Sequence, residues 1–220
     1  GFCIHLLQCR PQARHEDGQT IELPTTVSDK DILFTADRLV PQGRVQGIRY
    51  VVFVDPQVYA HIPDETTRLQ VARVVSWANQ ALQEKSFILM GPGRWGSNNP
   101  ELGVKVTYAD IYKTAMLVEI GLSDGDTAPE ASYGTHFFQD LVETNIYPLA
   151  VYPDQGDTRF NWDFFRNSRN VLADLVPKAV EYQDVVRVIE VPAVARGKRL
   201  EVVMDDESNQ ALGYLRRYPN

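Results

Sequence analysis

Cysteine is scarce in this sequence of 220 residues, and long apolar runs are missing. The two cysteines, Cys3 and Cys9, lie six positions apart in a segment that we expect to be a strand. That spacing separates them by roughly 20 Å, which excludes a disulfide between them. No apolar run approaches the roughly 20 residues of a membrane span, and nothing resembles a secretory signal peptide. We therefore expect no membrane partner and a reducing, cytoplasmic setting.

Positive charge and metal ligands are also limited. The formal net charge is -7, whereas a surface that binds nucleic acid normally needs an excess of lysine and arginine. We therefore expect no nucleic-acid partner. The four histidines are His5, His15, His61 and His136, and no two of them have the spacing of zinc ligands. The cysteines do not supplement them, so we expect no metal site within this chain alone.

A strand, a helix and a second strand follow each other between residues 47 and 90. "GIRYVVFVDP" (47–56) is typical of a buried strand, and so is "FILM" (87–90). The segment between them predicts a helix over 64–85 with Asp64 as its N-cap. Apolar side chains recur in it at helical spacing, at Val71, Val74, Val75, Ala78 and Leu82. We expect the two strands to be parallel, joined by a right-handed crossover.

The rest of the chain continues this alternation and then changes. A strand (116–122), a helix (135–145) and a strand (146–153) are predicted next, whereas 184–191, 199–205 and 211–218 alternate with a period of two. The predicted fold is α/β, a mixed sheet with strand–helix–strand units and a C-terminal antiparallel β meander. The predicted organisation is a terminal strand of a preceding module (1–12), a linker with a short strand at "DILFTA" (13–45), an α/β core domain (46–178) and a β-rich extension (179–220).

A glycine-rich segment, "GPGRWGS" (91–97), comes directly after the second buried strand. Loops in this position commonly bind ligands in α/β proteins, and glycine lets backbone N–H groups approach an anion closely. The candidate anion-binding residues are Gly91, Gly93, Arg94, Gly96 and Ser97. The alternative is a tight turn in which Arg94 pairs with a carboxylate and Trp95 packs in the core. The spacing matches neither a Walker loop nor a dinucleotide fingerprint.

A second group of small and polar residues lies at the start of the helix predicted over 135–145. Ser132, Gly134, Thr135 and His136 are the candidates there, because the N-terminus of a helix favours anions and His136 titrates near neutral pH. The alternative is that Ser132 or Thr135 caps the helix and His136 is an ordinary hydrogen-bonded residue. The sequence predicts that Arg94 faces this segment across a shared cleft.

The segment "LLQCRP" (6–11) resembles the closing strand of the ATP-grasp nucleotide-binding domain in phosphoenolpyruvate synthase and pyruvate phosphate dikinase. The resemblance implies that Gln8 helps to hold metal ions and that Arg10 contacts ATP phosphates. An amide oxygen suits magnesium and a guanidinium suits a phosphate. ATP and Mg²⁺ are thus implied for the parent protein only, and the cofactor of this chain is left open.

The remaining segments, "GPGRWGS", "LGVKV" and "SYGTHFFQDL" among them, resemble the C-terminal region of bacterial phosphoenolpyruvate synthase-like proteins. The phosphohistidine motif, the pyruvate-binding barrel and most of the ATP-grasp domain of true dikinases have no counterpart here. The resemblance therefore implies an accessory domain that is not catalytic alone. We expect it to contact the preceding nucleotide-binding module and to bind a phosphate- or carboxylate-bearing small molecule. The alternative is an interaction domain without a ligand, in which Arg94 and Trp95 are buried.

Overall fold

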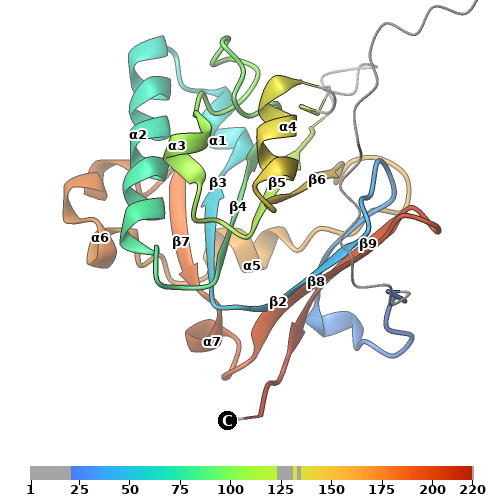
Figure 1. Ribbon diagram of the computed structural model, residues 1–220. Coiled ribbons are helices and arrows are strands. Elements are labelled where there is room, and N and C mark those ends of the chain that lie inside the picture. Colours follow the sequence, from blue (N-terminus) through green and yellow to red (C-terminus); the bar gives the residue numbers. More distant parts are fainter. Residues whose placement is uncertain (1–20, 123–130, 133–134, 220) are drawn as a thin grey trace, which may run out of the picture.

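The computed structural model describes residues 21–122, 131–132 and 135–219, and it contains two β-sheets with helices around them (Figure 1). The segment 1–12, with Gln8 and Arg10, lies outside the described residues, as does Gly134. The roles assigned to them, and the domain boundary after residue 12, therefore stay predictions. The α/β fold class is confirmed, because one sheet is mixed and the other is antiparallel.

The five-stranded sheet is formed by the apolar strands of the sequence. Its strands are β3 (Tyr50–Val54), β4 (Phe87–Pro92), β5 (Met116–Ile120), β6 (Tyr147–Val151) and β7 (Val186–Glu190), in the order β6-β5-β4-β3-β7. The first four are parallel, as expected for strand–helix–strand units, and β7 runs antiparallel to β3. The carboxyl ends of β3 to β6 therefore lie along one edge of this sheet.

Helices cover one face of this sheet (Figure 1). They include α1 (Pro56–Ala60), α2 (Glu65–Ala81), α3 (Tyr108–Ile111) and α4 (His136–Glu143). Asp64 is the N-cap of α2, since its carboxylate accepts a hydrogen bond from the Thr67 N–H at 2.8 Å. The apolar positions predicted to form the buried stripe of α2 are all buried, and they pack against Val52, Phe87 and Leu89 of the sheet. The predicted helix is confirmed.

The second sheet packs on the other face and draws its strands from both ends of the described chain. It contains β1 (Ile32–Ala36), β2 (Gly43–Ile48), β8 (Arg199–Asp205) and β9 (Gln210–Arg216), in the antiparallel order β1-β9-β8-β2. Its inward side chains join Val51, Phe53, Ile88 and Met90 in one apolar cluster. β8 and β9 form the expected antiparallel hairpin, whereas β7, predicted beside them, belongs to the five-stranded sheet.

Shorter elements close the gaps between these layers. They are the 3₁₀ helices η1 (Asp29–Asp31) and η2 (Pro177–Tyr182) and the helices α5 (Trp162–Asn167), α6 (Leu172–Leu175) and α7 (Val191–Val194). Sequence periodicity did not identify α5, α6 and η2, because pieces of about one turn are too short to show a helical repeat. Phe165 of α5 is fully buried and stacks on Phe53 of β3 with ring centroids 5.4 Å apart. This contact helps to cover the second face of the five-stranded sheet.

Candidate functional site

The glycine-rich segment lies at the carboxyl edge of the five-stranded sheet, as predicted. Its first two residues are part of β4, where Gly91 pairs with Glu119 and Pro92 with Ile120 of β5. The loop itself starts at Gly93, which forms an antiparallel bridge with Gly103. The chain therefore leaves the sheet and folds back on itself within ten residues.

The backbone N–H groups of this loop already have partners inside the protein. Gly93 donates to the Ile120 carbonyl at 2.9 Å, and Arg94 donates to the Leu102 carbonyl at 2.8 Å. Gly96 donates to the Val104 carbonyl at 3.1 Å. The Trp95 N–H donates to Oε1 of Glu119 at 2.9 Å. An anion cradle needs N–H groups that point at the ligand, and these four consecutive groups point at protein oxygens.

Close packing accounts for the glycines of the loop. Gly93 has a φ of +53°, and a Cβ built there would lie 2.1 Å from the Leu102 carbonyl oxygen. Gly96 has a φ of +69°, and its Cβ would lie 2.4 Å from the ring of Phe137. Both positions need a residue without a side chain, because of the left-handed backbone and because of the neighbouring atoms.

A buried carboxyl group, that of Glu119 in β5, links the glycine loop to the second candidate segment. Its Oε2 accepts a hydrogen bond from the Ser132 N–H at 2.7 Å, and its Oε1 accepts one from the Ser132 hydroxyl at 2.5 Å. The same hydroxyl lies 2.9 Å from the Trp95 carbonyl oxygen. Together with the bond from the Trp95 N–H, these contacts join the segments at Trp95 and Ser132. We call Trp95, Glu119 and Ser132 the Glu119 clasp.

The charge of the clasp depends on the protonation of Glu119. Burial raises the pKa of the Glu119 carboxyl, and it outweighs the hydrogen bonds from Ser132 and Trp95 and the charge of Arg94, which act in the opposite direction. The Glu119 side chain is only 7% exposed. The positive charge of Arg94 acts on this carboxyl, and the pairing of Arg94 with a carboxylate in the tight-turn alternative stays a prediction.

Side chains around the loop also make contacts within the protein. Trp95 is fully buried in the core beneath the helices, and within the described part of the chain its indole N–H has no hydrogen-bond partner. The hydroxyl of Tyr59, from α1, lies 2.8 Å from the Pro100 carbonyl and 3.0 Å from that of Gly103. The Ser97 hydroxyl accepts a hydrogen bond from the Asn99 N–H at 3.1 Å, within the loop itself. These contacts give Trp95 and Ser97 structural roles.

At the second segment, Thr135 is the N-cap of α4. Its hydroxyl accepts a hydrogen bond from the Phe138 N–H at 3.2 Å and donates to the Ser132 carbonyl at 2.7 Å. His136, the first residue of the helix, is exposed. The capping alternative therefore describes Thr135, while Ser132 belongs to the clasp.

The structure thus brings the two predicted segments together, but through a residue that the sequence analysis did not single out. Glu119 was missed because it was assigned to an ordinary strand, "MLVEIGL". Its signal was available: an acidic residue within a strand that is otherwise apolar needs a buried partner. Anion binding by Arg94, Ser97 or His136 stays a prediction.

Comparison with protein-family models, with curated proteins and with solved structures finds no match for this chain. Among residues 21–122, 131–132 and 135–219, no helix is both long and apolar enough to cross a membrane. The same described residues contain no cluster of histidine, cysteine, aspartate and glutamate that could hold a metal ion.

Proposed function

We propose that this chain is an accessory domain of a phosphoenolpyruvate synthase-like phosphotransferase, docks on the nucleotide-binding module of its parent, and is not catalytic alone. The main support for the proposal is that the backbone N–H groups of the glycine loop are already hydrogen-bonded within the protein. Its N–H groups bind protein oxygens, and its neighbour Ser132 binds Glu119. The loop that most resembles a ligand site therefore serves the fold, which favours a role in interaction over one in chemistry.

ATP and Mg²⁺ belong to the parent protein in this proposal. The resemblance assigns their contacts to Gln8 and Arg10, which lie outside the described residues. No acidic or histidine cluster in the described part of the chain fits a metal ion. No step of a phosphoryl transfer is therefore assigned to residues of this domain.

Mixing two separately produced polypeptides tests the proposal. The chain is titrated into the nucleotide-binding module of its parent, and we expect a saturable complex by calorimetry. We also expect no phosphoenolpyruvate from ATP and pyruvate with the chain alone. Turnover that is lost on mutation of this chain, or the absence of any complex with the module, contradicts the proposal.

A second candidate function is binding of a phosphate- or carboxylate-bearing small molecule at Arg94. The specific observation in its favour is that the Arg94 side chain stays partly exposed at the carboxyl edge of the parallel strands, where α/β proteins commonly bind ligands. A ligand at a hundredfold excess over its Kd stabilises a fold by about 2.7 kcal/mol.

Thermal unfolding with phosphate and phosphoenolpyruvate tests this second function. If Arg94 binds the anion, the melting temperature rises and Arg94→Ala abolishes the rise. Arg73→Ala is a matched control, because Arg73 is an exposed arginine on α2. A rise that survives in Arg94→Ala rules out binding at the glycine loop.

A further inference from the structure

The four-stranded sheet has a polar outer face, turned away from the core. Directly opposed residues of β8 and β9 lie on the same face of a sheet, and here Glu201 opposes Tyr214 and Arg199 opposes Arg216. Their neighbours Leu200, Val202 and Leu215 point to the core side. At this end of the β8–β9 hairpin, Arg199 and Arg216 therefore reach the surface on the outer face, whereas Glu201 and Tyr214 on the same face are buried.

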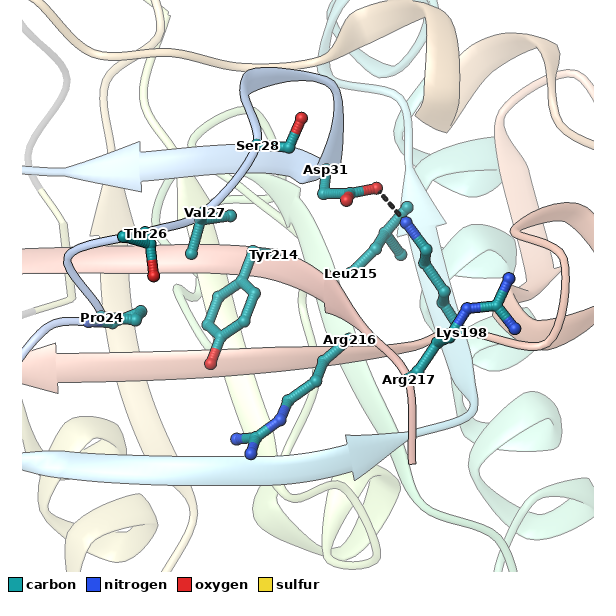
Figure 2. A pocket seen from close by; sticks show the side chains of 10 residues that line it. All are labelled: Pro24, Thr26, Val27, Ser28, Asp31, Lys198, Tyr214, Leu215, Arg216 and Arg217. Atoms are coloured by element: carbon teal, nitrogen blue, oxygen red, sulfur yellow. Dashed lines mark hydrogen bonds and ion pairs between the residues drawn. The ribbon is translucent and has the colours of Figure 1, made fainter. Parts of the chain in front are cut away.

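A groove lies on this outer face, next to the segment that leads into β1. Its volume is about 500 Å³, within the range of small-molecule sites. Figure 2 shows the segment with Pro24 and Val27 on one side of Tyr214, and Arg216 on the other. Hydroxyl groups and charges from Thr26, Ser28, Asp31, Lys198 and Arg217 complete the lining, together with the apolar Leu215. We call it the β9 groove.

Positive charge gathers in the β9 groove although the whole chain carries a net charge of -7. Three cationic side chains line it, against one carboxylate. Lys198 pairs with Asp31 at 2.5 Å, which neutralises both. Among the described residues, Arg217 has no hydrogen-bond or ion-pair partner, and it is exposed. The groove therefore has an arginine whose charge is not used by the fold.

Arg216 is held in place while half of it stays accessible. Its Nη1 donates to both carboxylate oxygens of Glu201, at 3.2 and 3.1 Å, and its side chain is 50% exposed. A guanidinium has five N–H donors, so the remaining nitrogens can meet a ligand without breaking this pair. Because the Glu201 side chain is fully buried, it fixes the arginine before any ligand arrives.

The pairing of the strands puts a second positive charge opposite Arg216, on a residue outside the lining of the groove. Arg199 lies directly across from Arg216, an arrangement that destabilises a sheet unless another group compensates. The ring of Tyr218 lies near both guanidinium groups, with centroid distances of 5.5 and 5.8 Å. An anion at this place would lower the repulsion between the two arginines.

We propose that the β9 groove binds a small phosphorylated molecule, with Arg217 as the phosphate ligand, Arg216 as a second cationic contact further along the groove, and Pro24 and Val27 as the wall for its organic part. Planar guanidinium groups suit phosphate oxygens. This site is separate from Arg94 and does not depend on docking to the nucleotide-binding module.

Nuclear magnetic resonance with inorganic phosphate and phenyl phosphate as probes tests the proposal on the intact chain. We expect saturable shifts of the backbone amides of 24–31 and 214–217, and tighter binding of phenyl phosphate because its ring contacts the apolar wall. Arg217→Ala should weaken binding about tenfold or more, the loss typical of one charged hydrogen bond. Since Arg217 has no partner among the residues that the structure describes, this variant should unfold at the same temperature as the original chain.

Two controls make the result decisive. Arg73→Ala removes one exposed arginine elsewhere and should leave the affinity unchanged, and Arg94→Ala should do the same. The proposal is overturned if the shifts do not saturate, if they spread over the surface, or if Arg73→Ala weakens binding as much as Arg217→Ala. Weaker binding in Arg94→Ala alone would instead place the anion at the glycine loop.

Discussion

The glycine loop and the β9 groove use the same kinds of residues in opposite ways. In the glycine loop, the backbone N–H groups donate hydrogen bonds to protein oxygens, and the Ser132 hydroxyl donates to the Glu119 carboxyl. These bonds hold the loop against the sheet. In the β9 groove, Glu201 and Asp31 hold two cations in place, while Arg217 remains without a partner among the described residues. A motif rich in glycine and arginine is therefore not by itself evidence of a ligand site.

The largest effect should follow from adding one methyl group to the glycine loop. Gly93→Ala places a Cβ 2.1 Å from the Leu102 carbonyl oxygen in a left-handed backbone, so we expect a loss of roughly 3 kcal/mol or more of unfolding free energy. Gly197→Ala is the matched control. Gly197 has a φ of +81°, and a Cβ built there would have no neighbouring atom of the described residues within 4 Å. This substitution should cost only about 1 kcal/mol in denaturant unfolding. Equal losses in the two variants would show that packing in the loop is loose.

The next largest effect concerns the Glu119 clasp. Ser132→Ala removes the hydroxyl between Glu119 and the Trp95 carbonyl, and we expect about 2 kcal/mol of destabilisation because the oxygens left behind are buried. Ser97→Ala removes a hydroxyl bonded only to an exposed N–H and should cost less than about 0.5 kcal/mol. If both serines prove equally dispensable in chemical unfolding, the clasp does not hold the loop.

For the outer face of the four-stranded sheet, Tyr218→Phe tests how much the hydrogen bonds of the Tyr218 hydroxyl contribute to stability. The Tyr218 hydroxyl donates to Oε2 of Glu201 at 2.6 Å and accepts from the Gly47 N–H at 2.9 Å. Removing it should cost about 1 kcal/mol, less than the change at Ser132, because both contacts are only partly buried. Thermal unfolding should show the difference, and a greater loss than in Ser132→Ala would reverse the order of the two regions.

The smallest effect is a change in pH dependence. Because the pKa of Glu119 is raised by burial, its favourable contribution is present at low pH and is lost as the pH rises through the folded-state pKa, above the ordinary value of 4.5. Glu119→Gln cannot ionise, so its stability relative to the original chain should improve between pH 4 and pH 8. Denaturant unfolding across this range measures the trend, and parallel curves for the two proteins would show that Glu119 does not titrate as described.

The apolar patterns of the sequence determined β3, α2, β4, β5, α4 and β6, because a buried strand and an amphipathic helix are coded by neighbouring residues. The N-cap at Asp64 was equally readable, since a cap needs only an acceptor before the first turn. Tertiary structure alone decided the rest. Strands from residues 32–48 and 199–216 form one sheet, and Glu119 meets Ser132 and Trp95, through contacts between residues far apart in the chain. The glycine loop could be located from its residues, but whether its N–H groups were available depended on Ile120, Leu102 and Val104, which no local pattern connects to it.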